Sequence, residues 1–403
     1  MNILLIHQNF PGQFRNLVPV WAAKGHVLAA IHSGSRTASY PGVSRCVSDS
    51  PNVGNSKGVH PWAQEFESKM IRAEACARAC QTLKAEGFEP DLVFAHPGWG
   101  EPLMMKSIFP RARLVCLMEF FYRARGLDMG FDPEFPLVSL EEEARLLAKN
   151  ANLLLAMDMM DLGVTPTPWQ ASTLPAWLGS KLHVIHEGID TARFAPDAGA
   201  EITLPDRGVT VRPGDEVLTF VARNLEPVRG YHIFMRALPE IMRRRPNVKV
   251  FIIGGDGVSY GATPAEGSYR VRYLQEVGSG LDPQRVFFMG QVPYEVFRRL
   301  MQITRCHVYL TYPFVLSWSM LEAMSAGALV VGSDTGPVRD VIESGRNGLL
   351  ADFFDVDALA LQVSEVLAEP ARFDAMRRNG RNTVIERFDL QTVCLPAYAR
   401  LLQ

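Results

Sequence analysis

The stretch from Tyr312 to Val331 (YPFVLSWSMLEAMSAGALVV) constrains the fold most, because it predicts a turn, a helix and a buried strand in direct succession. It follows an apolar, β-branched run that closes at Pro313, a residue that cannot donate to a sheet ladder. Ser319 and Glu322 have the S-x-x-E spacing of a capping box at a helix start. A strand, a helix N-terminus beyond its carboxyl end and a parallel strand form the anion-binding corner of an open α/β sheet.

Strands and helices are expected to alternate along the whole chain, as they do in parallel sheets with crossover helices. Because 403 residues exceed what one hydrophobic core usually organises, we expect two doubly wound units in tandem rather than one large sheet. The expected strands lie near residues 3–7, 27–32, 92–96, 114–118, 153–156 and 182–185, and then near 217–222, 248–253, 286–289, 307–311, 328–331 and 348–351. The clearest helices are expected at 13–24, 65–85 and 140–150, and a small hairpin or loop at 197–216.

Composition and charge exclude several classes of protein. With 41 basic and 43 acidic side chains the chain is no polycation, so nucleic acid is not expected as its main partner. The six cysteines form no C-x-x-C pair and no zinc-like cluster, and Asp355-x-Asp357 is expected to cap a helix, so we expect no metal site. No run approaches the ~20 apolar residues of a membrane span, and the opening MNILLIH lacks the basic lead of a signal peptide, which favours the cytoplasm.

The helix of the first stretch resembles a known signature. It is similar to the motif E-G-F-G-x-x-x-x-E-A-M-A-x-G of family 4 glycosyltransferases, retaining enzymes of the GT-B fold, with Glu322 at the second glutamate. In that family the second glutamate binds the ribose hydroxyls of the sugar nucleotide, which implies the same role for Glu322. The first glutamate, which touches the transferred sugar, falls on Phe314, and the two motif glycines fall on Val315 and Ser317.

Other segments of the second half resemble elements of the same family. Arg223 and Arg229 in RNLEPVRG match R-x-x-x-x-x-K-G, whose two cations grip the donor diphosphate, with arginine in place of lysine. A solvated arginine face is the alternative. Gly255 lies in a turn similar to the family's G-x-G, which lines the nucleotide cleft. VFFMGQVP matches V-x-F-x-G-x-V-P, in which the backbone around Gly290 and Val292 meets the base.

In the first half, three residues at or beyond expected strand ends are candidates. Gly12, in HQNFPGQ, lets the backbone approach a ligand, unless it only forms a plain strand-to-helix turn. His96 ends LVFAH and Glu119 ends LVCLME, on a face that the resemblance assigns to the acceptor and the transferred sugar. The alternatives are a structural histidine and, for the glutamate, neutralisation by its neighbours Tyr122, Arg123 and Arg125.

The resemblance implies two Rossmann-like domains that face each other across a cleft. Residues 1–188 would form the acceptor-side domain and 189–388 the sugar-nucleotide domain, with 389–403 as a helix that crosses back to the first. The reaction would move a sugar from a nucleotide sugar to an acceptor hydroxyl with retention, without a metal or another cofactor. Arg223, Arg229, Glu119 and His96 would be the catalytic residues, the arginines stabilising charge on the leaving diphosphate.

Several features stay open at this level. The sequence does not decide the donor nucleotide (UDP, GDP or ADP), the oligomeric state or whether the protein contacts the inner face of the membrane. The acceptor could be a glycan, a glycolipid or a small molecule, in the synthesis of a cell-envelope polysaccharide or another glycoconjugate. A sugar-nucleotide epimerase or phosphorylase on the same fold is the rival enzyme class. An inactive nucleotide-binding protein is the third reading, because Phe314 cannot accept hydrogen bonds from a sugar. Alternatively, the sugar could present an apolar edge, such as a deoxy position, to this ring. In the reading that we favour, backbone N–H groups of residues 315–318, among them Val315, Ser317 and Trp318, hold the sugar together with Glu119.

Overall fold

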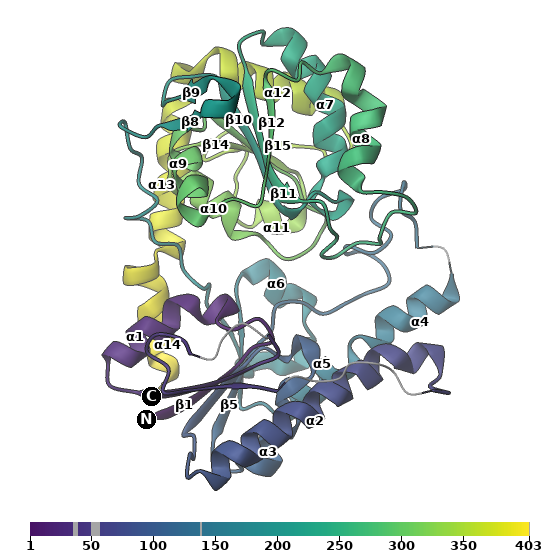
Figure 1. Ribbon diagram of the computed structural model, residues 1–403, viewed down its shortest axis with the longest axis vertical. Coiled ribbons are helices and arrows are strands. Elements are labelled where there is room, and N and C mark those ends of the chain that lie inside the picture. The colour runs from purple at the N-terminus through teal and green to yellow at the C-terminus, as the bar shows by residue number, and fades with distance from the viewer. Residues whose placement is uncertain (35–38, 50–56, 138, 403) are drawn as a thin grey trace. The chain divides into compact units, whose positions relative to one another are not determined.

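The computed structural model describes residues 1–34, 39–49, 57–137 and 139–402. The chain divides into two compact units, Met1–Gly188 together with Cys394–Gln403, and Ile189–Val393 (Figure 1). Within the described residues, no helix is both long enough and apolar enough to cross a membrane.

The first unit is built on a parallel sheet. Its described residues form seven strands in the order β3-β2-β1-β4-β5-β6-β7, and β1 pairs in register with β2 and β4. The central strands are short, apolar and buried on both faces, because helices cover both sides of a parallel sheet, whereas the edge strands β3 and β7 are only partly buried. They are β1 (Asn2–Ile6), β2 (Val27–His32), β3 (Arg45–Ser48), β4 (Leu92–Ala95), β5 (Arg113–Leu117), β6 (Leu162–Thr165) and β7 (Leu182–Val184).

Helices connect these strands, and the last helix of the chain packs with them. Tyr398 of that helix lies against Phe94 of β4, and its hydroxyl donates to the carbonyl of Ile185 at 3.4 Å. The helices are α1 (Leu17–Ala23), α2 (Gln64–Ala85), α3 (Met105–Ile108), α4 (Leu140–Ala148), α5 (Ala151–Met159), α6 (Pro168–Thr173) and α14 (Leu395–Leu401). Short 3-10 turns lie at η1 (Gly12–Asn16), η2 (Pro61–Ala63), η3 (Pro97–Trp99), η4 (Glu101–Met104) and η5 (Ala176–Lys181).

One expected strand of this unit is wrong. Residues 153–156 belong to helix α5, and the strand lies later, at β6. The apolar run has helical spacing, since Leu153, Ala156 and Met157 are buried while Leu154 and Leu155 are 42% and 45% exposed. A continuous apolar run does not separate a strand from a helix without knowledge of which side chains are covered.

The second unit repeats the architecture. Its six-stranded parallel sheet, as described, has the order β12-β11-β10-β13-β14-β15, and a separate antiparallel hairpin, β8-β9, lies within the segment expected to form one. Helices lie on both sides of the sheet (Figure 1). The strands are β8 (Ile202–Leu204), β9 (Val209–Val211), β10 (Val217–Asn224), β11 (Lys249–Gly255), β12 (Val286–Gly290), β13 (Cys306–Tyr309), β14 (Leu329–Ser333) and β15 (Leu349–Ala351).

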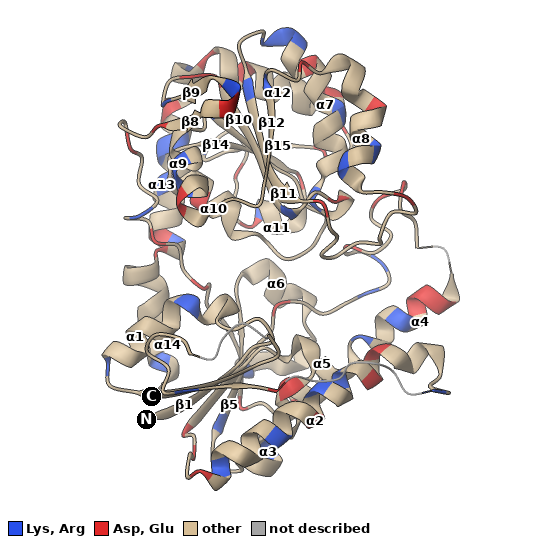
Figure 2. Ribbon diagram, in the orientation of Figure 1, with Lys and Arg blue, Asp and Glu red and all other residues tan. Residues whose placement is uncertain are grey.

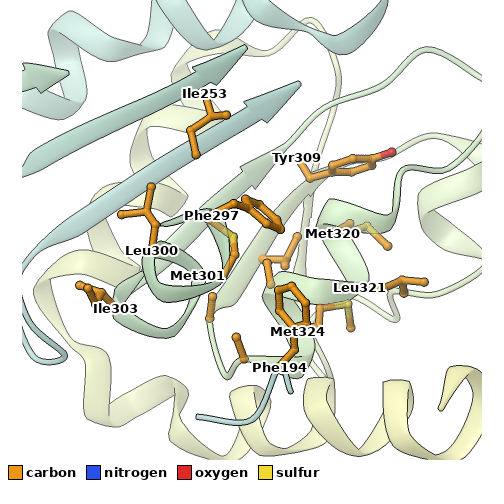
Figure 3. Close-up of a cluster of buried hydrophobic side chains, with 14 of the residues drawn as sticks. Phe194, Ile253, Phe297, Leu300, Met301, Ile303, Tyr309, Met320, Leu321 and Met324 are labelled. Atoms are coloured by element: carbon orange, nitrogen blue, oxygen red, sulfur yellow. The ribbon is translucent and has the colours of Figure 1, made fainter. Parts of the chain in front are cut away.

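The helices of this unit enclose a large apolar core. Figure 3 shows Phe297, Leu300 and Met301 facing Met320 and Met324. The α-helices are α7 (Tyr231–Arg244), α8 (Tyr269–Val277), α9 (Tyr294–Ile303), α10 (Trp318–Ser325), α11 (Gly336–Arg339), α12 (Val356–Ala368) and α13 (Asp374–Phe388). Shorter turns are η6 (Pro205–Arg207), η7 (Pro227–Arg229), η8 (Gly278–Gly280), η9 (Pro370–Phe373) and the π-helical η10 (Leu390–Cys394). As predicted, Asp355 caps a helix, accepting from the N–H of Ala358 at 2.8 Å.

Gly230 provides a test of how tightly the start of α7 is packed. It has φ of 68°, and a Cβ there would lie 2.2 Å from Cβ of Leu310. We expect Gly230→Ala to lower the free energy of unfolding by about 2–4 kcal/mol, from backbone strain and steric overlap together. Gly208, with φ of 61° and open space around it, is the control, and Gly208→Ala should cost only the backbone strain. Chemical denaturation measures both, and equal losses would contradict the packing argument.

Candidate functional site

The residues predicted in the second half gather at the carboxyl-terminal edge of the second sheet. When strands β10 to β15 are numbered 1 to 6 along the chain, they lie in the sheet in the order 3-2-1-4-5-6. The strand order therefore reverses between β10 and β13, which is the topological switch point. Open α/β sheets bind ligands at that point. Arg223 lies at the end of β10, Gly255 ends β11 and Gly290 ends β12, while α10 starts after β13.

The first turn of α10 differs from the prediction. Its N-cap is Ser317, whose Oγ accepts from the N–H of Ser319 at 3.4 Å, so the expected capping box of Ser319 and Glu322 is wrong. The chain turns at Ser317 because its own N–H donates to the hydroxyl of Tyr309 at 2.7 Å. The helix therefore begins at Trp318, and Glu322 is left for another role.

Glu322 is 4% exposed and lies one turn into α10. Its Oε1 accepts a hydrogen bond from the hydroxyl of Tyr294, the first residue of α9. A buried carboxylate requires such a partner, because its desolvation costs free energy. The structure thus holds this carboxylate in a fixed position near the start of the helix, where the role implied by resemblance needs it.

Arg229 is held inside the unit, with 7% of its surface exposed. Its Nη1 donates to Thr311 Oγ1 at 2.9 Å, to the carbonyl of Val315 at 2.9 Å and to Tyr309 Oη at 3.3 Å. These three acceptors belong to β13 and the loop before α10. The guanidinium therefore fixes that loop, and contact with a diphosphate stays a prediction.

Arg223 has the opposite environment. It is exposed, and its side chain forms no hydrogen bond or ion pair with the residues that the structure describes. An exposed cation at a strand's carboxyl end can bind an anion without first breaking an internal bond. Arg223 is therefore the available cation of this edge, and Arg229 is the anchored one.

Phe314 forms a tilted aromatic pair with Tyr260 beside Arg229. Its ring centroid is 4.9 Å from that of Tyr260, and the guanidinium carbon of Arg229 lies 5.2 Å from the Tyr260 centroid and 5.6 Å from that of Phe314. Phe314 is 5% exposed, so the position of the family's first glutamate is closed by an apolar ring. Cation–π contacts of this kind stabilise a buried guanidinium without a carboxylate.

Glu226 fixes the loop that carries Tyr260. Its side chain is fully buried, and its carboxylate accepts from the backbone N–H groups of Ser259, Tyr260 and Gly261 at 3.0–3.2 Å. The sequence analysis missed both Glu226 and Tyr260. Their pairing joins segments far apart in the chain, and no local motif marks it.

The other donor-side candidates act through the backbone. A Cβ on Gly255 would lie 2.6 Å from Asn224 Oδ1, so a larger residue there would require the Asn224 side chain to move. Gly290 has φ of 61° with open space around it, and Val292 packs partly buried against the core. At Gly290 the open space leaves backbone peptide groups at the end of β12 uncovered. Contact of this backbone with a base stays a prediction.

In the first unit, His96 and Glu119 meet at the carboxyl-terminal edge of the sheet. His96 Nε2 lies 3.0 Å from Glu119 Oε2, and Gln13 Nε2 donates to Glu119 Oε1 at 2.5 Å. Gln13 in turn bonds His7 Nε2 at 2.6 Å through its Oε1. Arg123, which the sequence offered as a neutralising partner, donates instead to the carbonyl of Thr173 at 3.1 Å.

Gly12 shapes this network by its lack of a side chain. It has φ of 46°, and a Cβ there would lie 2.3 Å from the ring of His7. The sequence analysis did not select His7 or Gln13. A histidine at the end of the first strand was the available signal for His7, whereas the link through Gln13 depends on the tertiary fold.

Two carboxyl groups of the first unit have opposite pKa shifts. Burial raises the pKa of Glu101 from 4.5 to about 7, and neither of its oxygens has a hydrogen-bond partner. Burial also disfavours the charge of Glu119, but the interactions with His96 and Gln13 outweigh it and hold the pKa of Glu119 below its ordinary value. Glu119 is thus kept as a carboxylate at the predicted acceptor edge.

Among the described residues, no group of three or more histidine, cysteine, aspartate or glutamate side chains could hold a metal ion. Of the charged candidates at the two edges, Arg229, Glu322 and Glu119 are each held by side-chain or backbone partners, whereas Arg223 is held by none of the residues that the structure describes.

The two carboxyl groups predict opposite pH responses. Between pH 4.5 and about 7 the folded Glu101 keeps a proton that the unfolded chain has lost, so wild-type stability falls as pH rises. Glu101→Gln should remove this loss, which is at most about 3 kcal/mol. Glu119→Gln should instead remove a contribution that is present above the ordinary carboxyl pKa and is lost on acidification.

Denaturation followed by tryptophan fluorescence checks both variants, since five of the six tryptophans lie in the first unit. An unchanged pH profile in Glu101→Gln would contradict the burial argument. The Glu119→Gln variant serves as the matched control, because it makes the same chemical change with the opposite expected sign.

Two family models match the chain in succession. Residues 24–194 match the glycosyl transferase family 4 group, and residues 205–383 match the glycosyl transferases group 1. The two matched segments fall on the two units in order.

Curated relatives match over part of the chain. GDP-mannose-dependent alpha-(1-6)-phosphatidylinositol monomannoside mannosyltransferase of Mycolicibacterium smegmatis is 30% identical over 221 residues, which are 51% of this chain and 52% of that protein. D-inositol 3-phosphate glycosyltransferase of Rhodococcus opacus is 28% identical over 206 residues, 49% of this chain and 42% of that protein. The chain therefore spans about half the length of these curated relatives.

Solved structures match over the full length. Sucrose-phosphate synthase of Thermosynechococcus elongatus has a TM-score of 0.73 at 19% identity, covering 100% of this chain and 99% of that one. HepE of Anabaena in complex with UDP-glucose has a TM-score of 0.67 at 18% identity with the same coverage. These likenesses confirm the predicted fold class, the α/β GT-B fold with two Rossmann-like domains. In sequence, the chain is thus similar to the glycosyl transferase family 4 group over residues 24–194 and to the glycosyl transferases group 1 over residues 205–383.

Proposed function

We propose that this protein is a retaining glycosyltransferase that moves a sugar from a nucleotide sugar to an acceptor hydroxyl. The observation that carries the proposal is the convergence, at one switch point of the second sheet, of an available cation, a helix start and a fixed carboxylate. Arg223, the N-terminus of α10 and Glu322 supply these three. A nucleotide sugar presents a diphosphate and a ribose diol, which need a cation and a hydrogen-bond acceptor respectively.

In this proposal the reaction depends on electrostatics. Negative charge develops on the leaving diphosphate, and Arg223 would neutralise it by direct contact while Arg229 acts from behind the loop that it anchors. Neither step requires a metal ion, and the donor would be the only co-substrate. Glu119 and His96 would contact the acceptor and the transferred sugar from the first unit, with Gly12 allowing close approach of the backbone.

The names of the relatives support nucleotide-sugar chemistry without fixing the donor. One relative is named for GDP-mannose, and one solved structure contains UDP-glucose. A thermal-shift screen against UDP, GDP, ADP, CMP and dTDP identifies the base, because a ligand at 100 times its Kd stabilises by about 2.7 kcal/mol. A transfer assay with the matching nucleotide sugars and product analysis then separates transfer from epimerisation, phosphorolysis and inactivity. Failure of every nucleotide to bind would overturn the proposal.

We expect Glu322→Ala to weaken binding of the selected nucleotide by tenfold or more, the equivalent of about 1.5–3 kcal/mol for a hydrogen bond to a charged group. Calorimetry measures the affinity. Tyr294→Phe is the matched control, because it removes the internal partner of Glu322 and keeps the carboxylate. If Glu322 has only a structural role, both variants will lose stability and neither will lose affinity.

The expectation for Arg223→Ala concerns the diphosphate alone. The affinity of the variant for the nucleoside diphosphate should fall by about tenfold or more, and its turnover should fall as well. Its affinity for the phosphate-free nucleoside should stay unchanged. Arg243→Ala, which changes an exposed arginine at the end of α7, is the control. Equal loss of affinity for nucleoside and nucleoside diphosphate would rule out the assigned contact.

A further inference from the structure

A second pocket lies away from the proposed nucleotide edge. It has a volume of about 630 Å³ and belongs entirely to the second unit. Its walls include residues that immediately precede β10, β13 and β14, so it opens at the amino-terminal edge of the sheet. The proposed nucleotide contacts lie at the opposite, carboxyl-terminal edge, and none of the proposed contact residues lines this pocket.

Four arginines line the pocket: Arg305, Arg377, Arg378 and Arg381. The one carboxylate among its lining residues is Asp374. Three of the arginines come from α13, where basic residues appear along the helix in Figure 2. The lining therefore has an excess of three positive charges, in a chain whose overall net charge is −2.

Two of these arginines also hold the fold. Arg381 donates to the carbonyls of Phe194 at 3.1 Å and Thr191 at 3.2 Å, and Arg305 donates to the carbonyl of Leu367 at 2.7 Å. Carbonyl oxygens satisfy the N–H groups but carry no formal charge. Burial lowers the pKa of both arginines, as expected for charges held without a dominant anionic partner.

The other two arginines, Arg377 and Arg378, do not hold backbone carbonyls of the described residues in this way. Arg377 forms an ion pair with Asp374 one turn earlier on α13. Arg378 is exposed and makes no hydrogen bond or ion pair with any residue that the structure describes.

Outside the lining, Glu216 and Asp215 act on Arg305 and Asp389 acts on Arg381. Glu216 is itself bound by Arg245, whose Nε lies 3.0 Å from Oε2, and Asp389 by Thr191 and Thr392. The charge of the pocket is therefore not neutralised by its surroundings.

We propose that this pocket is a second binding site, for a phosphorylated small molecule. Guanidinium groups bind phosphate oxygens in a bidentate, charge-assisted way, and several of them together match a doubly charged phosphate. The volume lies in the range of small-molecule sites. Pro196, Pro213 and Pro370 add a rigid apolar wall for the carbon part of the ligand. The site is independent of the nucleotide-sugar contacts.

The chain offers a matched control for the test. Arg377 and Arg378 are adjacent on α13 and follow an acidic residue by one turn; Arg243 and Arg244 are adjacent on α7 and follow Glu240 in the same way. The double variant Arg377→Gln/Arg378→Gln removes the pocket pair, and Arg243→Gln/Arg244→Gln removes the same charge elsewhere. Neither pair belongs to the proposed nucleotide site, so both variants should keep wild-type nucleotide affinity.

Calorimetry with inorganic pyrophosphate and ribose 5-phosphate measures binding, and phenylglyoxal modification read by mass spectrometry locates it. We expect both probes to protect the peptide with Arg377 and Arg378 and not the peptide with Arg243 and Arg244. Ribose 5-phosphate affinity should fall by about tenfold or more in the pocket variant and by less than about twofold in the control.

Vesicles of phosphatidylcholine with and without phosphatidylglycerol distinguish a free phosphate compound from a lipid headgroup. If the pocket variant loses vesicle binding, and soluble phosphates do not protect Arg377 and Arg378 of the wild-type protein, the site is a membrane contact and the proposal is wrong. Absence of protection by both soluble probes, or equal loss of affinity in the two double variants, also overturns it. If the nucleotide screen still identifies a bound nucleotide, any of these results overturns only the second site and not the proposed function.

Discussion

The arrangement of the second unit depends on one buried cation. Arg229 Nη1 holds Thr311 and the carbonyl of Val315, and it also reaches the hydroxyl of Tyr309, which in turn receives the N–H of Ser317. The position at which α10 starts is therefore set by a hydrogen-bond network that begins at a residue far earlier in the chain. Loss of the guanidinium would leave several acceptors buried without a donor, which costs more than the bonds themselves contribute.

The fold-level predictions succeeded where the sequence has strong local patterns. Buried parallel strands are continuous apolar runs, and the expected strand near residues 217–222 matches β10. The same reasoning failed at Leu153, because the run there has helical spacing and the reader of a sequence cannot see which leucines are covered. The short edge strand β3 was missed, since Arg45–Ser48 has only one strongly β-forming residue between polar ones.

The candidate site was predictable to the extent that chemistry lies at strand ends. Parallel strands place their carboxyl ends at one edge, so His96 and Glu119 could be expected near each other, and they meet at 3.0 Å. The contacts that orient them were not predictable, because Gln13 reaches Glu119 across 106 positions of sequence. Likewise, Glu226 holds the Tyr260 loop by accepting hydrogen bonds from its backbone N–H groups. Which way these N–H groups point depends on the folded turn, and the sequence does not reveal it.

The aromatic pair of Phe314 and Tyr260 explains how this chain departs from the family motif at position 314. A glutamate at this position, beside a buried guanidinium, would form an ion pair and neutralise Arg229. With phenyl and phenol rings instead, 5.6 and 5.2 Å from the guanidinium carbon, the cation is stabilised by ring quadrupoles and keeps its full charge. Burial lowers the pKa of Arg229, but Tyr309, Tyr260 and the nearby Glu226 outweigh that effect and raise it above its ordinary value, so the charge persists at any physiological pH.

Under the proposed function, that difference favours a working enzyme over an inactive one. Stabilisation of a leaving diphosphate requires positive charge that is already in place. Replacement of the glutamate by Phe314 removes a sugar contact, but it also removes the anion that would have offset Arg229. The sugar hydroxyls must then be held by other groups, and within the second unit the backbone at Ser317 and Trp318, at the start of α10, is the candidate.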